Sequence, residues 1–222
     1  MIKEFIQLIY PDFCSGCKHQ LLFSEKSICS SCLSEFRMSS KINNHRYYGR
    51  KLINKEIYAS NFFKNKLLQK MIHEIKYNGN KGTAYVLGIE LGYLIKDSCN
   101  YKEFDFIIPV PTSEIKKLKR GYNQSELIAN GVSKIIKKPI LINYLLRENN
   151  LRSQINSDKY KRWKNVDQQY KLAKPLIENS NILLIDDVVT TGATINSCVE
   201  AILTKTKTKK IKITVGALAG NK

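Results

Sequence analysis

Short apolar runs alternate with longer amphipathic stretches along most of the chain. The short runs are rich in β-branched residues, which is typical of buried parallel strands. The longer stretches repeat their apolar positions every three or four residues, which is typical of helices. Strands are predicted at 56–63, 106–110, 182–185 and 209–220, and helices at 64–77, 84–98, 127–136 and 195–203. Because strands and helices alternate, we expect an α/β fold, a parallel sheet flanked by helices.

Two segments lack this pattern. Residues 39–55 are polar and basic, and residues 147–174 carry many charges with little apolar periodicity. We predict a linker at 41–55 and a long loop at 147–174, since loops of that length inside a compact domain are often functional. The 222 residues then suit a small N-terminal part, residues 1–40, and one main α/β domain, residues 56–222.

The charge balance is strongly basic and unevenly distributed. The chain has 37 basic and 19 acidic side chains, a net charge of +18. Residues 1–40 carry four of each sign, so the whole excess belongs to the rest of the chain. Such a charge favours a phosphorylated substrate or a nucleic-acid backbone. Lysine-rich surfaces are also common in proteins with a general Lys and Asn bias, and this chain shows that bias.

Neither a membrane span nor a secretory signal is predicted. No apolar run approaches the ~20 residues needed to cross a bilayer. The N-terminal stretch MIKEFIQLIYPDFC has no basic region followed by a long apolar core, and no small-residue cleavage site. We therefore expect a cytoplasmic protein without membrane insertion.

Four of the six cysteines form two closely spaced knuckles, Cys14-x2-Cys17 and Cys29-x2-Cys32. Two such knuckles can present four thiolates to one tetrahedral Zn²⁺ in a structural site. The segment has few apolar residues, so metal binding would supply its folding free energy. Disulfides are the alternative, and the expected cytoplasmic setting disfavours them. Four thiolates around Zn²⁺ give a negative cluster, which makes this part a poor grip on phosphates.

The stretch ILLIDDVVTTGATI, residues 182–195, suggests a site for a sugar phosphate. Ligands of open α/β sheets bind beyond the carboxyl ends of the strands, where Asp186 and Asp187 are expected. The small residues at 190–194 let backbone N–H groups surround a phosphate at the start of the next helix. Ribose 5-phosphate, together with Mg²⁺, fits this arrangement. A plain turn followed by a helix start is the alternative reading.

A second candidate loop follows the strand at 106–110. Pro109 and Pro111 end that strand, and a lysine-rich loop leads to Arg120-Gly121-Tyr122-Asn123-Gln124. A tight loop with basic residues just beyond it would suit a pyrophosphate group. An ordinary strand-to-helix connection is the alternative.

These motifs together resemble the ComF family of competence-associated proteins, which are similar to the type I phosphoribosyltransferases. The resemblance is carried by the two knuckles, IKYNGN, IIPVP, RGYNQ and LLIDDVVTTGAT. It implies binding of phosphoribosyl pyrophosphate (PRPP), with Asp186 and Asp187 on the ribose hydroxyls and Arg120 near the reacting groups. The implied 5-phosphate loop comprises Thr190, Thr191, Gly192, Ala193 and Thr194, and the implied pyrophosphate loop comprises Val110, Pro111, Thr112 and Ser113. Gln154, Arg162 and Asn165 match the family's later basic loop, although Leu151 stands where the family usually has Thr.

Two functions are compatible with this resemblance. One is transfer of the phosphoribosyl group to an unidentified acceptor; no base-selecting hood is found, and a cysteine module and linker take its place. The other is the handling of imported single-stranded DNA, together with DNA-uptake proteins, during natural transformation. Basic residues among aromatic ones could then pair with phosphates and stack bases, or the aromatic rings could simply pack the loop down. The candidate DNA contacts are Lys159, Lys161, Arg162, Trp163 and Lys164.

Overall fold

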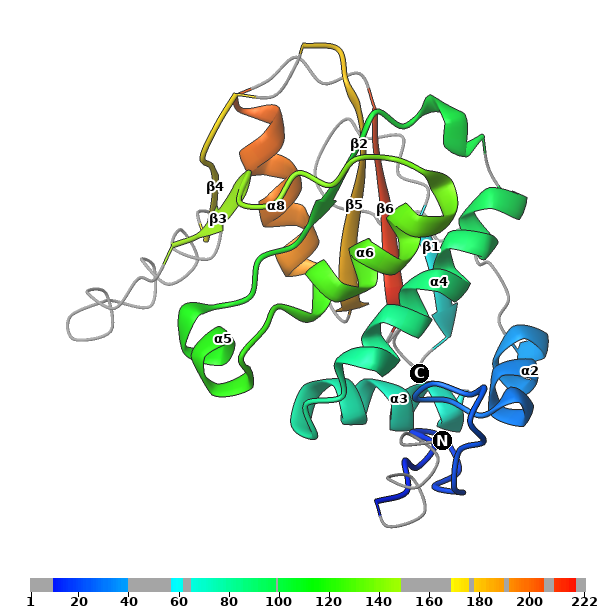
Figure 1. The fold of residues 1–222 in the computed structure, drawn as a ribbon. Coiled ribbons are helices and arrows are strands. Elements are labelled where there is room, and N and C mark those ends of the chain that lie inside the picture. The colour runs from blue at the N-terminus through cyan, green and yellow to red at the C-terminus, as the bar shows by residue number, and fades with distance from the viewer. Residues whose placement is uncertain are drawn as a thin grey trace.

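The centre of the molecule is a four-stranded parallel sheet (Figure 1). Its strands are β1 (Ile57–Asn61), β2 (Phe106–Pro109), β5 (Asn181–Val189) and β6 (Lys210–Leu218), in the order β1-β6-β5-β2. The computed structural model describes residues 10–39, 57–61, 65–98, 100–148, 169–175, 178–189, 192–205 and 210–218. The predicted α/β class, a parallel sheet flanked by helices, is confirmed.

Helices cover both faces of the sheet. Along β5, Leu183 and Ile185 are buried in one apolar cluster, which also contains residues of α3 (Lys66–Tyr77), α4 (Lys81–Ser98) and α6 (Gln124–Ile136). The alternate residues Ile182 and Leu184 are buried in a second cluster with α8 (Ala193–Leu203). Successive side chains of a strand point to opposite faces, so each cluster fills one side of the sheet. Shorter elements are α2 (Ser30–Ser39), the 3-10 helix η1 (Tyr101–Glu103), α5 (Glu114–Arg120), β3 (Leu145–Arg147) and β4 (Tyr170–Leu172).

Helix α3 begins and ends where its sequence predicts. The Asn65 side chain accepts a hydrogen bond from the Leu68 N–H at 2.9 Å, which satisfies a free donor of the first turn. The helix stops at Asn78, and Gly79 follows with φ +69°, a left-handed conformation that glycine adopts without strain. This places Lys76 in the last turn, beside the carboxyl ends of the strands.

Helices α4 and α6 pack unusually closely through two glycines. A side chain at Gly88 would clash with the Ile128 carbonyl, and one at Gly131 would clash with the Tyr85 carbonyl. Only glycine permits so close an approach of two helix backbones. The contact fixes the position of α6, and with it the N-terminal turn that faces the pocket described below.

The N-terminal segment shares a core with α3 rather than standing apart from it. Cys14, Ile28 and Phe36 are buried in the same cluster as Leu67 of α3, and a side chain at Gly16 would clash with Leu67. Three polar contacts add to this packing: Ser15 Oγ with Thr83 Oγ1 at 2.6 Å, Arg37 Nε with Glu90 Oε2 at 2.6 Å, and Lys18 with Glu74. The division at residues 40 and 56 stays a prediction, and the linker, 41–55, lies outside the described residues.

Two regions expected to be loops contain regular structure. The lysine-rich stretch after β2 forms α5, because the Ser113 side chain caps its first turn and Gly121 ends it with φ +80°. The ends of the charged segment 147–174 contribute to an antiparallel pair, β3 and β4, in which Arg147 lies opposite Tyr170. Strands of three residues are too short to show a periodic pattern. None of the helices in the described part of the chain is long and apolar enough to span a bilayer.

Candidate functional site

The two aspartates lie inside β5, and the prediction that they follow its end is wrong. β5 pairs with β6 from Asn181 to Val189, with Asp186 opposite Val215. On its other side β2 ends at Pro109, opposite Ile185. Because one neighbouring strand stops where the other continues, Asp186 and Asp187 stand at a step in the sheet. The step leaves open space on the β2 side.

Asp186 is buried and closely surrounded by donors. Its Oδ1 accepts hydrogen bonds from Ser125 Oγ at 3.0 Å and from the Asp187 N–H at 2.9 Å. Burial, and then the neighbouring charge of Asp187, raise the pKa of Asp186 to about 7, although these hydrogen bonds and Lys76 oppose the rise. The side chain therefore changes charge near neutral pH.

Asp187 is held differently. Its carboxylate lies 3.0 Å from Lys76 Nζ, and its Oδ1 accepts the Val188 N–H at 2.7 Å. Lys76 thus brings a cation from α3 to the aspartate pair. One carboxylate of the pair has an ionic partner and the other has neutral donors.

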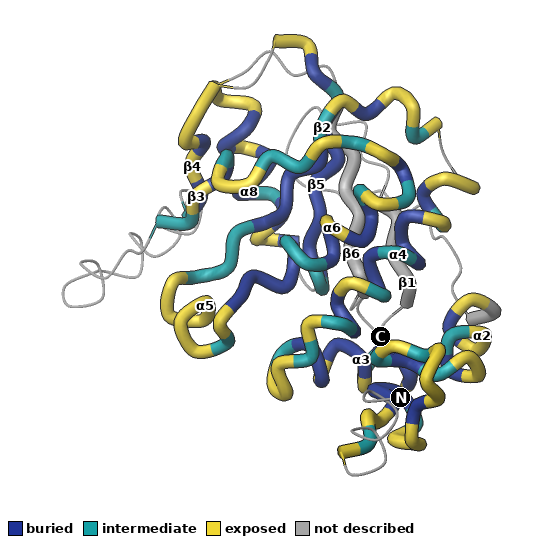
Figure 2. Tube along the Cα trace, in the orientation of Figure 1, coloured by how far each residue is buried: buried dark blue, intermediate teal, exposed yellow. Residues whose placement is uncertain are grey.

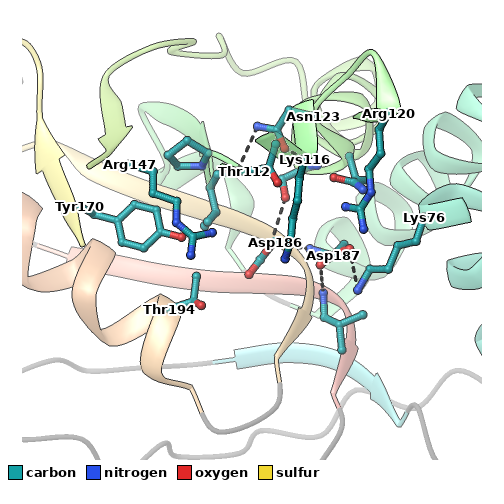
Figure 3. Close-up of a pocket in the computed structure, with 15 residues that line it drawn as sticks. Lys76, Thr112, Lys116, Arg120, Asn123, Arg147, Tyr170, Asp186, Asp187 and Thr194 are labelled. Carbon is teal, nitrogen blue, oxygen red and sulfur yellow. Dashed lines mark hydrogen bonds and ion pairs between the residues drawn. The ribbon is translucent and has the colours of Figure 1, made fainter. Parts of the chain in front are cut away.

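Both aspartates line a polar pocket of about 270 Å³ (Figure 3). In Figure 3, Arg147, Tyr170 and Thr194 lie on one side of Asp186, whereas Arg120 and Lys76 lie on the other. Lys116 also contributes to the wall, one helical turn from Arg120 on α5. Among the described residues, Lys116, Arg120 and Arg147 form no ion pair with an acidic side chain. Free cations on both sides of two carboxylates suit a ligand that has hydroxyls between two anionic groups.

The first turn of α6 supplies further polar groups. Asn123 caps the helix and donates from Nδ2 to the Val110 carbonyl at 3.0 Å, which ties the loop after β2 to α6. Gln124 is buried, lines the pocket, and has no partner for its Nε2 atom among the described residues. An unpaired buried donor is costly, and an acceptor atom of a ligand would satisfy it.

The residues predicted to contact PRPP or nucleic acid fall into three groups. Val110, Pro111, Thr112, Arg120 and Thr194 line the pocket together with the two aspartates. Ser113, Gly192 and Ala193 are not part of its wall: Ser113 caps α5, and Gly192 caps α8, whose first residue is Ala193. Outside the described residues lie Thr190, Thr191, Gln154, Lys159, Lys161, Arg162, Trp163, Lys164 and Asn165. Their roles stay predictions.

Sequence reasoning did not assign several of the lining residues. Lys76 belongs to the motif IKYNGN and Gln124 to the motif RGYNQ. Both motifs carry the family resemblance, but neither residue was predicted to line the pocket. Arg147 and Tyr170 come from the antiparallel pair of β3 and β4, and the Arg147 guanidinium lies 5.7 Å from the centroid of the Tyr170 ring. Nothing in their spacing relates them to Asp186. Only the pairing of β3 with β4 brings them to the pocket.

The four predicted metal ligands come together in the structure. The sulfurs of Cys14, Cys17, Cys29 and Cys32 all lie within 4.8 Å of one another. Cys14 Sγ accepts N–H groups of Gly16 at 3.3 Å and Cys29 at 3.2 Å. Burial opposes ionisation, yet such backbone N–H groups lower the pKa of Cys14 to about 7. The cluster could hold a metal ion, because four thiolates at this spacing fit one tetrahedral centre.

The family of the chain follows from comparison with known proteins. A family model described as the phosphoribosyl transferase domain matches residues 81–221. The chain belongs to the phosphoribosyl transferase family. The match covers strands β2, β5 and β6, helix α6 and both aspartates, whereas the cysteine cluster, β1 and Lys76 lie before it.

The predicted resemblance of this phosphoribosyl transferase-type protein to the ComF family is confirmed by two curated relatives, both of them competence proteins. Competence protein F of Haemophilus influenzae is 24% identical over 205 residues, which cover 90% of this chain and 87% of the relative. Competence protein ComFC of Bacillus subtilis is 26% identical over 47% of this chain and 41% of its own length. Among solved structures, glutamine PRPP amidotransferase from B. subtilis, complexed with ADP and GMP, is similar with a TM-score of 0.43. It is 16% identical, and the match covers 62% of this chain and 27% of that one.

Proposed function

We propose that the pocket binds phosphoribosyl pyrophosphate together with Mg²⁺. The observation that carries this proposal is the buried Asp186 beside Asp187, flanked by Arg147 on one side and Lys116 and Arg120 on the other, cations without an ionic partner in the described part of the chain. Two carboxylates can accept hydrogen bonds from the two ribose hydroxyls. The flanking cations can then neutralise the phosphates at either end of the sugar.

The two ends of the pocket differ in what they offer. The 5-phosphate would lie at Thr194 and the start of α8, in the loop formed by Thr190 to Thr194, with Arg147 as an additional cation. The pyrophosphate would lie along Val110 to Ser113, near Lys116 and Arg120, where Gln124 Nε2 could donate to one of its oxygens. Mg²⁺, held mainly by the ligand's phosphates, would offset their charge.

We further propose that the protein is a ComF-like cytoplasmic protein that handles imported single-stranded DNA during natural transformation. The names of the two curated relatives and the net charge of +18 support this role. DNA-uptake proteins would be its partners, and Lys159 to Lys164 would contact the DNA. The cysteine cluster would hold Zn²⁺ as a structural ion.

An active phosphoribosyltransferase is the second candidate, because cations surround the place where a leaving pyrophosphate would form. In this reaction the bond between C1 and the pyrophosphate oxygen breaks, the oxygen keeps the electron pair, and an acceptor atom bonds to C1. Lys116 and Arg120 would stabilise the departing charge, while Asp186 and Asp187 hold the ribose.

Calorimetry with PRPP and Mg²⁺ tests the proposed site. The wild-type protein should bind, and Asp186→Asn combined with Asp187→Asn should abolish binding; a wild-type protein that gives no heat would rule the site out. The same samples, supplied with nucleobases or amines, separate the two candidates, since only a transferase releases pyrophosphate in an acceptor-dependent way. For the DNA role, reversing the charges of Lys159, Lys161, Arg162 and Lys164 should weaken single-strand binding.

A further inference from the structure

Helix α5 has no buried residue. Figure 2 shows it as an almost wholly exposed element that projects from the body of the molecule. Ile115 is 65% exposed and Leu118 is 83% exposed, although both are large and apolar. A helix this short gains little stability by itself, and here the caps at Ser113 and Gly121 replace a packed face. Its exposed residues therefore call for an explanation other than packing.

Two of the basic side chains of α5 line the pocket, and two others are exposed to solvent outside it. Lys116 and Arg120, four positions apart, line the pocket. Lys117 and Lys119 do not line it and are exposed. With Glu114 as its only acidic residue, the helix presents a concentrated positive charge that continues outward from the pocket.

An exposed aromatic pair, His73 and Tyr77, lies on α3 beside a residue that lines the pocket. Lys76 lines the pocket from the last turn of α3, and the next residue, Tyr77, is 70% exposed. The ring of His73 lies 4.8 Å from that of Tyr77, at an interplanar angle of 42°. Tyr77 thus presents a supported aromatic ring to solvent and directly follows Lys76, which lies on the same side of Asp186 as Arg120 (Figure 3).

We propose that α5 and the last turn of α3 bind single-stranded nucleic acid. Backbone phosphates would contact Lys117 and Lys119, while bases would stack on Tyr77 and pack against Ile115 and Leu118. Cations beside an exposed aromatic ring are the usual means of holding a single strand, whose bases are free to stack. The proposal rests on the proposed role in DNA handling and is independent of PRPP binding. It places nucleic acid on a surface other than the predicted Lys159 to Lys164 contacts.

The charge part of the proposal is tested by fluorescence anisotropy with labelled oligothymidylate at several salt concentrations. Lys117→Ala with Lys119→Ala should weaken binding at least tenfold and reduce the salt slope by about 1.4, since each phosphate contact contributes about 0.7. The matched control is Lys102→Ala with Lys134→Ala. It removes two exposed lysines from η1 and from the far end of α6, and it should change affinity much less. PRPP binding should be unaffected in both variants. Equal effects of the two double variants would overturn the α5 surface.

The stacking part has its own readout. Tyr77→Ala should lower affinity about 5- to 150-fold without changing the salt slope, and Tyr77→Phe should restore it. An acidic peptide is the rival occupant, so polyglutamate serves as a competitor that has charge but no bases. The surface is not one for nucleic acid if polyglutamate competes as well as oligothymidylate and Tyr77→Ala has no effect. A wild-type protein that does not bind oligothymidylate would instead refute the DNA role itself.

Discussion

Lys76 and Asp187 form an ion pair in the wall of the pocket, with 3.0 Å between Nζ and Oδ2. The pair joins the last turn of α3 to the strand that carries both aspartates. The ammonium group of Lys76 also favours the ionised form of Asp186, against the burial that raises its pKa. One lysine therefore pairs with Asp187 and also favours the charged form of Asp186.

Replacing Lys76 should weaken ligand binding. Lys76→Met is expected to raise the Kd for PRPP about tenfold, because it leaves Asp187 unpaired beside Asp186. Lys76→Arg should retain most of the affinity. Lys70→Met, which removes an exposed lysine from the same helix, is the control. Calorimetry measures all three, and equal affinities of Lys76→Met and Lys70→Met would contradict the role of Lys76.

Asp186 should make stability depend on pH. Its pKa is about 7 in the folded protein, compared with 3.8 for the free side chain. The folded state thus binds the proton more tightly, so the stabilising effect of protonation is complete below about pH 4 and is lost as the pH rises through 7. Each pKa unit corresponds to about 1.4 kcal/mol.

Asp186→Asn should remove this dependence. The variant is expected to gain stability relative to the wild type as the pH rises from about 4 to about 7, because an amide stays neutral there. Above about pH 7.5 the difference should stay constant, since Asp186 is then ionised in both the folded and the unfolded wild-type protein. Urea unfolding of metal-loaded protein across both pH ranges measures the difference. Asp97→Asn, at an exposed position on α4, is the control and should leave the pH profile unchanged. A constant difference between wild type and Asp186→Asn from about pH 4 to about pH 7 would show that burial does not shift this pKa.

The two ends of the pocket should be separable with fragments of the ligand. Arg147→Ala should weaken ribose 5-phosphate about 10- to 100-fold and leave pyrophosphate unchanged, whereas Lys116→Ala should do the reverse. Lys171→Ala serves as the control. Lys171 lies on β4, pairs with Glu148 and does not line the pocket, so its removal should leave both affinities unchanged. If Arg147→Ala weakens both fragments alike, the assignment of the ends is wrong.

Metal removal should affect both ends of α3. We expect one Zn²⁺ per chain, and Cys32→Ser should lose it and unfold at a lower temperature. PRPP affinity should fall as well, because the cysteine segment packs on Leu67 of the helix that carries Lys76. Cys198→Ala is the control, since Cys198 is buried in the other cluster and should keep the metal. Elemental analysis and calorimetry measure these effects; full PRPP affinity without metal would contradict the coupling.

Periodicity predicted the elements that have a long apolar pattern. The buried positions of α3 and the aliphatic run of β5 are examples, because burial imposes a repeat that the sequence displays. The short elements were not predicted. α5 buries nothing, so it has no apolar face to detect, and β3 and β4 are too brief to establish alternation.

The candidate site was predictable where neighbours in sequence act together. Asp186 and Asp187 stand in one stretch with the predicted phosphate loop, and the spacing of the four cysteines is visible directly in the sequence. Lys76, Arg147 and Tyr170 meet the aspartates only through packing of separate elements. A single sequence does not predict this proximity, because the spacing of these residues along the chain does not indicate how close they lie in the folded protein.

The contact between the cysteine knuckles and α3 bears on how the protein can be dissected. The predicted linker suggests truncating the chain near residue 56, so that only the predicted main domain, which carries the pocket, is kept. Such a fragment would expose Leu67 to water and leave Glu74 and Glu90 without their ionic partners Lys18 and Arg37, so it should be prone to aggregation. Moving the part of the chain that carries the pocket into another protein would therefore require moving the cysteine knuckles as well.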